Sequence, residues 1–320
     1  ITRGPTNSLL LRDIRYQASL LAGQDYKTSA LTQIANSTGN PDEERSLAAL
    51  FTKFETSLQA LHDTPESPAV QRNTLDAAKT LAQGFHTAEN AIRLGREKAD
   101  RDIATGVGVA NDALDKIEGL NELIIAQKAA GSDISNLLDE RDRQIDRLSE
   151  QIGIRTFMRD NGAVVITTKE GITLLDGDAL KIDFTPVSAV PPGAFLGGGL
   201  SGLTVNGADI TPTGGVPQAA VTGRIAGAFQ VRDDNLVAYQ QQIDELARAR
   251  KGDGNIAEEI GDLLFTVVNL CRHEGVDAEG ALIRSLRPRG ESHGRFSGVE
   301  DVQLDGRFAL ASEPREGRVQ

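Results

Sequence analysis

One stretch of fifty residues, 103–152, constrains the fold of this chain more than any other. In its first half, a mostly apolar residue recurs at alternating spacings of four and three. This pattern is typical of the seam along which one helix packs against a partner helix. A single polar residue in such a seam, here Asn121, usually sets the register of the packing. The members of the seam are Ile103, Val107, Ala110, Leu114, Ile117, Asn121 and Ile124.

A short break and a second helical pattern follow the seam. Residues 129–133, with the sequence AAGSD, interrupt the periodicity. Two helices joined by a short turn of Gly, Ser and Asp predict an antiparallel hairpin. We expect the helices before and after it to pack against this hairpin. The stripe of the second helix comprises Leu138, Arg141, Ile145, Leu148 and Ile152.

Three helices are predicted before the hairpin. The first covers residues 9–34, and the second begins at Pro41-Asp42-Glu43-Glu44, where a proline and acids suit the first turn of a helix. The prolines at 65 and 68 end it, because two prolines in four residues cannot sit inside a helix. A third helix is expected over about residues 69–98. Residues 1–152 are therefore predicted to be the first part of a helical rod domain.

The periodicity changes after Gly153. Residues 154–177 predict a β-meander with turns at 160–162 and 170–171. Residues 187–217 are rich in Gly and Pro and suit either short strands or a mobile excursion. A helical pattern then returns over residues 223–250.

The predicted fold is mainly α, an elongated antiparallel helical bundle that carries a small β domain. The β-rich outer domain or excursion covers residues 153–222, and the returning helix of the rod covers 223–250. A helical tail, partly disordered after about residue 286, is expected over residues 251–320.

Composition limits the possible partners. The net charge of −12 argues against nucleic acid or an anionic membrane, because both repel a negative surface. No apolar run reaches membrane-spanning length, so we expect no membrane insertion. The opening residues, ITRGPTNSLL, contain no signal-peptide apolar region, so any export is expected to use another route. No nucleophilic Ser/His/Asp or Cys/His set is visible, and no catalytic residue is predicted.

Three segments carry a family resemblance over about residues 8–248. They are PDEERSLAALFTKFETSLQALHD with its continuation to residue 94, NLLDERDRQIDRLSEQIGI, and GRIAGAFQVRDDNLVAYQQQIDELA. They resemble the flagellar hook-associated protein 1 family, the hook–filament junction proteins related to flagellin. The most specific pieces are residues 136–142 and the later group Gly227, Arg232 and Asp233 with Leu246-Ala247.

The resemblance implies a structural, non-enzymatic subunit of the bacterial flagellum, exported to the outside of the cell without a cleaved signal peptide. The implied partners are other junction, hook and filament subunits and an export chaperone. The family also implies terminal helices that form a coiled coil. We expect neither of them within residues 1–320, so we do not expect this stretch to polymerise by itself. The residues expected to carry function are packing residues: Leu114, Ile117, Ile124, Leu138, Ile145 and Leu148.

The last part of the chain supports an alternative. Residues 244–301, including GNIAEEIGDLLFTVVNLCRHEG, resemble the C-terminal half of a MazG-type nucleoside triphosphate pyrophosphohydrolase. Acids on one helix face can hold Mg²⁺ through oxygen ligands, and this family uses Mg²⁺ in that way. Arg248 occupies the position of one expected acid, and a cation there repels the metal, so we predict a half-site that is inactive unless a partner chain completes it. No cofactor is predicted, and Mg²⁺ would bind only under this alternative. Under this alternative the metal ligands would be Glu245, Glu258, Glu259 and Asp262. A fusion of the two families, joined between residues 244 and 255, is the third possibility.

Two further segments have simpler interpretations. The mixed-charge run over residues 139–147 predicts a solvated helix face with i,i+3 and i,i+4 pairs, and a subunit interface is the second interpretation. The glycine-rich run over residues 193–202 lacks the Lys-Ser/Thr pair of a phosphate-binding loop, and we interpret it as a loop.

Overall fold

The computed structural model describes residues 5–39, 43–191, 193–213 and 215–248, with side chains from residue 10 to residue 245 of those ranges. All of them belong to one compact unit, Ile1–Leu270. The predicted tail over residues 251–320 lies outside the described residues, as do Glu258, Glu259 and Asp262.

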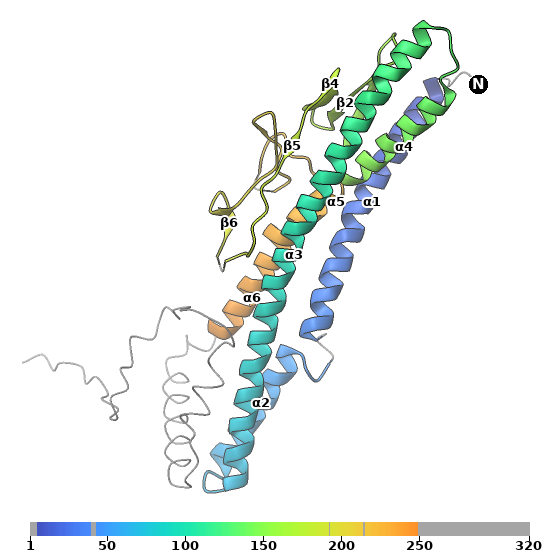
Figure 1. Cartoon of the computed structure of the whole chain (residues 1–320). Coiled ribbons are helices and arrows are strands. Elements are labelled where there is room, and N and C mark those ends of the chain that lie inside the picture. Colours follow the sequence, from blue (N-terminus) through green and yellow to red (C-terminus); the bar gives the residue numbers. More distant parts are fainter. Residues whose placement is uncertain (1–4, 40–42, 192, 214, 249–320) are drawn as a thin grey trace, which may run out of the picture. The chain divides into compact units, whose positions relative to one another are not determined.

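A single helix, α3 (Pro68–Ala129), contacts every other described helix (Figure 1). Its 62 residues span about 93 Å at a rise of 1.5 Å per residue. The prediction of two helices, one over 69–98 and one from 103, was wrong, because nothing between them breaks the helix. Gly84 and Gly95 lie inside α3, and their missing side chains make room for Leu50 and Ile34 from neighbouring helices.

The helices α1 (Pro5–Thr38) and α2 (Leu47–Asp63) precede α3 and pack on it. The predicted start of α2 at residues 41–44 was wrong. The hydroxyl of Ser46 accepts a hydrogen bond from the backbone N–H of Ala49 at 3.2 Å, and this N-cap starts the helix at Leu47. The predicted break is confirmed, since α2 ends at Asp63 and Pro68 opens α3.

The predicted hairpin is confirmed. All seven members of the seam on α3 are buried. The partner helix is α4 (Ser135–Gln151), which follows a turn containing Gly131 at a φ of +71°. On the stripe of this second helix, Leu138 is half-buried, while the other four members, Arg141, Ile145, Leu148 and Ile152, are buried.

The predicted meander is also confirmed. The strands β1 (Ile154–Met158), β2 (Val164–Thr168), β3 (Thr173–Asp176) and β4 (Asp178–Ala179) form a four-stranded antiparallel sheet in chain order. Its first two turns contain Gly162 and Gly171 at positive φ, +96° and +103°. Glycine populates this left-handed region without steric cost.

The Gly- and Pro-rich stretch over residues 187–217 was predicted to form either short strands or a mobile excursion, and it contains short strands. The strands β5 (Ile182–Asp183), β8 (Thr204–Val205) and β9 (Ala208–Asp209) form a small antiparallel sheet. The strands β6 (Phe195–Leu196) and β7 (Gly199–Leu200) form a parallel pair.

The chain then returns to α3 in three helical pieces. These are α5 (Arg224–Phe229), a π-helical turn η1 (Gln230–Asn235) and α6 (Leu236–Arg248). A single regular helix over residues 223–250 was predicted, and the π turn corrects that prediction.

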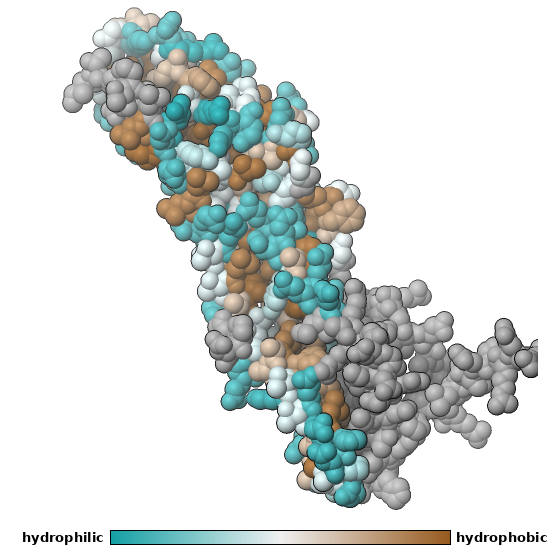
Figure 2. All heavy atoms as spheres, turned by 180° about the vertical axis from the view of Figure 1, so that it is seen from behind, coloured by the Kyte–Doolittle hydropathy of each residue, from teal (hydrophilic) through white to brown (hydrophobic). Residues whose placement is uncertain are grey.

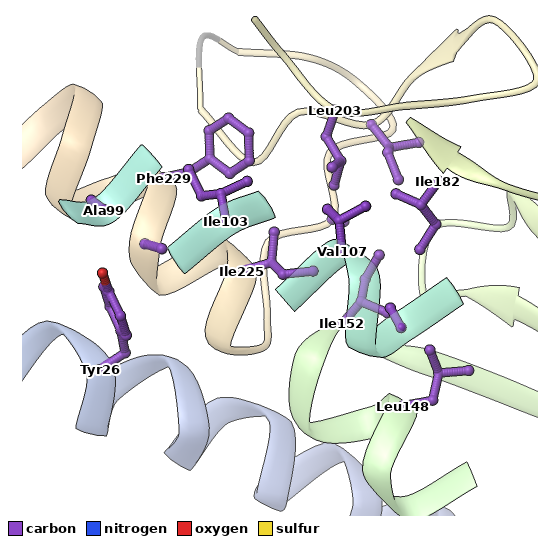
Figure 3. Close-up of a cluster of buried hydrophobic side chains, with 14 of the residues drawn as sticks. Tyr26, Ala99, Ile103, Val107, Leu148, Ile152, Ile182, Leu203, Ile225 and Phe229 are labelled. Atoms are coloured by element: carbon purple, nitrogen blue, oxygen red, sulfur yellow. The ribbon is translucent and has the colours of Figure 1, made fainter. Parts of the chain in front are cut away.

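One hydrophobic core joins the helices to the strands. In Figure 3, side chains of α3, α4 and α5 meet side chains of the β-rich segment. Ile103 and Val107 of α3 lie beside Phe229 and Ile225 of α5, with Leu203 from the strand side. The same core takes in Val164, Ile166, Leu174, Ile182 and Val205.

The contact between α1 and α5 depends on glycine, which generates a stability prediction. A Cβ built on Gly227 would lie 2.5 Å from the carbonyl oxygen of Gly23, a backbone atom that cannot rotate away. A Cβ on Gly108 of α3 would meet no atom within 4 Å. Gly227→Ala should lower the free energy of unfolding by about 1–3 kcal/mol, because it forces the helices apart. Gly108→Ala should raise it by up to about 1 kcal/mol through helix propensity. Urea unfolding of both variants checks this, and a shift in the same direction for both would contradict the packing described.

Candidate functional site

The two largest fully buried side chains of the described chain are both arginines, Arg141 and Arg232. A buried guanidinium requires acceptors for its donors, since an unpaired buried charge costs several kcal/mol. Each arginine therefore marks a point where separate elements of the fold must meet in a fixed geometry.

Arg232 lies in the π turn and pairs with two carboxylates. Its Nη1 donates to Oδ1 of Asp100 on α3 at 2.6 Å, and both side chains are fully buried. Its Nε and Nη2 donate to the two carboxylate oxygens of Asp233 at 2.8 and 2.9 Å. Nη2 also donates to the carbonyl oxygen of Ser201 at 3.2 Å. One guanidinium therefore bonds both aspartates.

The two aspartates extend the network into the loops of the β-rich segment. Oδ2 of Asp100 accepts from the backbone N–H of Val187 at 2.7 Å. Oδ2 of Asp233 accepts from the hydroxyl of Thr213 at 3.1 Å. Both ends of residues 187–213 are therefore bonded to the carboxylates that hold Arg232.

A second cation on α3 completes the network. Arg96 donates from Nε to the carbonyl oxygen of Arg232 at 2.9 Å and from Nη2 to that of Ala194 at 2.7 Å. Burial lowers the pKa of Arg96, and Asp233 partly opposes this effect. An arginine nevertheless stays protonated in proteins, so two cations balance two carboxylates here.

Aromatic rings cover the guanidinium. The Cζ atom of Arg232 lies 4.6 Å from the ring centroid of Phe229 and 5.8 Å from that of Phe184. The two rings pack edge to face with centroids 5.9 Å apart. Such cation–π contacts stabilise a desolvated arginine and keep water away from the ion pairs.

The π turn explains why two consecutive residues take part. Successive residues of a regular helix point about 100° apart, whereas the wider turn of η1 leaves Arg232 fully buried beside a nearly buried Asp233. The sequence marked Arg232 and Asp233 as specific to the resembled family. It carried no signal for their partner Asp100, 132 positions away.

Asn121 and Arg141 form a second buried group, which positions the strands β1 and β2. Oδ1 of Asn121 accepts from the N–H of Val164 at 3.0 Å, and its Nδ2 donates to the carbonyl oxygen of Val164 at 2.9 Å. Arg141 donates to Oδ1 of Asn121 at 3.1 Å and to the carbonyl oxygen of Gly162 at 2.7 Å. The polar residue of the seam therefore fixes the position of a strand.

The mixed-charge run is only partly solvated, which corrects the prediction for residues 139–147. Arg141 is buried, and Arg15 of α1 reaches Asp146 at 2.6 Å and Asp142 at 3.4 Å. On its outer side, Glu140 pairs with Arg143 at i,i+3 as predicted, and the hydrogen bond from Arg143 lowers the pKa of Glu140.

A buried tyrosine supports the contact between α1 and α3. The hydroxyl of Tyr26 donates to Oδ2 of Asp102 at 2.8 Å. Burial, followed by this hydrogen bond, raises the pKa of Tyr26 well above its ordinary value. The hydroxyl is therefore a neutral donor at any physiological pH.

Five of the six predicted packing residues are confirmed as core, and the sixth, Leu138, is only half-buried. Ile145 is 2% exposed, and the other four are fully buried. Glu245, from the alternative metal site, lies exposed on α6. The fully buried members are Leu114, Ile117, Ile124 and Leu148.

The described residues show neither a metal cluster nor a membrane helix. Within those ranges, no group of three or more His, Cys, Asp or Glu side chains could hold a metal ion. No described helix is both long enough and apolar enough to cross a membrane.

The glycine-rich run over residues 193–202 contains the short pair of strands β6 and β7. The carbonyl oxygen of Ala194 in this run accepts a hydrogen bond from Arg96.

A family model described as the flagellar hook-associated protein FlgK helical domain matches residues 31–261. The chain belongs to this family. "Flagellar hook-associated protein 1" of Escherichia coli K12 is 28% identical over 211 residues, which cover 64% of this chain and 37% of that protein. The protein of the same name from Salmonella typhimurium is 29% identical over 153 residues, which cover 47% of this chain and 28% of the relative.

A solved structure shares the fold. The flagellar hook junction protein FlgK from Burkholderia pseudomallei matches with a TM-score of 0.56 and 21% identity, covering 74% of this chain and 41% of the other. The chain thus spans well under half the length of these FlgK relatives. Both buried arginines lie inside the stretch matched by the FlgK family model.

The Arg232 network generates a second stability prediction. Arg232→Met leaves the buried carboxylates of Asp100 and Asp233 without their cation and should lower the free energy of unfolding by about 3–5 kcal/mol. Lys181→Met is the matched control, because Lys181 pairs with Asp115 at 2.6 Å while the two side chains are 57% and 50% exposed. The control should cost less than about 1 kcal/mol. Equal losses for the two variants in urea unfolding would show that the buried network does not anchor the fold.

Proposed function

We propose that this chain supplies the helical framework of a structural subunit at the flagellar hook–filament junction. It acts by assembly with other subunits and catalyses no reaction. The observation that carries the proposal is the match of the FlgK helical-domain family to residues 31–261, which include the whole of α3, the strands and the returning helices.

The internal geometry supports a role in transmitting force. Asn121 of α3 bonds the four-stranded sheet at Val164, and Asp100 of α3 bonds both the loop at Val187 and the π turn at Arg232. Force applied to the β-rich segment therefore passes into α3 through buried hydrogen bonds. We further propose the predicted division of the chain: rod residues 1–152 and 223–250, an outer β-rich part over 153–222, and a separate tail over 251–320.

The partners and location are part of the same proposal. Subunits of the junction, hook and filament are the partners, together with an export chaperone. The protein works outside the cell, after export without a cleaved signal peptide. Family membership supports these statements, and they extend to this chain from relatives of which it spans only a part.

The pyrophosphohydrolase alternative stays a prediction about the tail. Its one described acid, Glu245, is exposed on α6. The proposed function includes no cofactor, and Mg²⁺ enters only under that alternative.

A chimaera tests the proposal. The matched segment of the Escherichia coli relative would be replaced by the matching segment of this chain, in cells that lack their own hook-associated protein 1. The proposal predicts that the chimaera is exported and restores filaments on hooks, as counted by electron microscopy. A chimaera that is exported and folded but leaves the hooks bare would contradict the proposed role.

The Arg232→Met version of the same chimaera is the internal control. If the framework carries the function, this version should restore fewer filaments at raised temperature, because a larger fraction of the destabilised protein is then unfolded. Equal filament counts for the two chimaeras at every temperature would show that the function does not depend on the Arg232 network.

A further inference from the structure

We propose that Met158 is an oxidation site: a peroxide converts its sulfur to a sulfoxide, which then accepts a hydrogen bond from the buried Arg141 and stabilises the hairpin of β1 and β2. Met158 is the last residue of β1 and is 63% exposed. Apolar side chains reach the surface elsewhere too, in separate patches between polar ones on the face in Figure 2, so exposure alone does not mark a site. What distinguishes Met158 is the group that its sulfur contacts.

The sulfur of Met158 lies against a cation. Its Sδ atom accepts a hydrogen bond from Nη2 of Arg141 at 3.6 Å. A thioether sulfur is a weak acceptor, whereas a guanidinium is a charged donor. Arg141 is only 2% exposed, so water has little access to this donor. The contact therefore joins a strong buried donor to a weak acceptor at the surface.

The guanidinium is held in place, and the methionine is not. Nη1 of Arg141 donates to Oδ1 of Asn121 at 3.1 Å and to the carbonyl oxygen of Gly162 at 2.7 Å. An exposed Met side chain has three rotatable bonds and can turn its sulfur. The donor is thus preorganised, and an oxygen added to the sulfur can be turned toward it.

The reaction is a two-electron oxidation by hydrogen peroxide. A lone pair of the sulfur attacks one oxygen of the peroxide, so an S–O bond forms while the O–O bond breaks. The departing hydroxide takes the proton of the transferred hydroxyl group and leaves as water. One thioether and one peroxide therefore give one sulfoxide and one water. Because Met158 is exposed, the peroxide can reach its sulfur from the solvent.

The product is a better partner for Arg141 than the thioether. The 3.6 Å between Nη2 and the sulfur leaves room for the new oxygen at about 2.7–2.9 Å from Nη2, the range of a charge-assisted hydrogen bond. Oxidation of a buried Met disrupts a core, because it places a polar group among apolar ones. At a 63% exposed residue this cost is small, and the gained hydrogen bond decides the sign.

The new hydrogen bond would close the hairpin at a third point. Met158 of β1 is the cross-strand partner of Val164 of β2. Asn121 already bonds both backbone groups of Val164, and Arg141 already bonds Gly162 in the turn between the strands. A sulfoxide at Met158 would attach the end of β1 to the same buried group. Local opening of the hairpin should therefore become rarer.

Peroxide treatment of the full chain in a Cys271→Ser background tests the site, and the inference does not rest on the junction role. The sequence contains no second Met, so a mass gain of one oxygen reports Met158. We expect this gain, and we expect amide exchange in β1 and β2 to slow by about fivefold, the factor that one net hydrogen bond supplies.

Two substitutions separate the hydrogen bond from other effects of oxidation. Met158→Gln carries a permanent amide oxygen and should show slower exchange without peroxide. Met158→Leu has no acceptor and should not respond to peroxide. The matched control is Leu123→Met in the Met158→Leu protein, because Leu123 is a 50% exposed position of α3. Oxidation there should leave exchange in β1 and β2 unchanged.

The proposal fails at the site if Met158 stays reduced in the folded chain under conditions that oxidise free methionine. It fails at the hydrogen bond if oxidation leaves exchange in β1 and β2 unchanged or makes it faster. An equal effect from oxidised Leu123→Met would also overturn it, because the benefit would then not depend on Arg141.

Discussion

The buried ion pair between Asp100 and Arg232 is the interaction on which the rest of the structure depends. Both side chains are fully buried, and the pair joins the centre of α3 to the π turn at which the chain returns. Removing two charges from water is costly, and the cost is offset only when every remaining donor and acceptor is satisfied. The loops of the β-rich segment provide those partners, through Val187 and Ser201 among others. The ion pair and the loops are therefore stable only together.

The periodic part of the fold could be predicted from the sequence because it depends on local rules. The seam from Ile103 to Ile124, the turn at Gly131 and the meander all follow from apolar spacing and glycine-containing turns, and the structure confirms them. The continuity of α3 was missed because the helical pattern before residue 98 and the seam from Ile103 were taken as two helices. Gly84 and Gly95 lie inside α3 and leave space that residues from α1, α2 and α6 fill, which a local pattern cannot show.

The candidate site could be predicted only in part, because a local sequence pattern does not show contacts between residues far apart in the chain. Arg232, Asp233 and Arg141 stood out in the sequence as residues shared with a family, and all three are buried or nearly so. Their partners are distant in sequence: Asp100 lies on α3, and Asn121 bonds a strand 43 positions later. A π turn also has no propensity of its own that a sequence reveals, since it arises where tertiary contacts favour one extra residue in a helix.

Native-state hydrogen exchange of the wild-type chain and the Arg232→Met variant tests the central claim most directly. The claim is that the buried network holds residues 187–213 on α3, while Asn121 independently holds the start of β2. Amides within 187–213 should therefore lose protection in the variant, whereas those of β1 and β2 should keep theirs in sub-global exchange. Unchanged protection in 187–213, or equal loss in β1 and β2, would contradict the account.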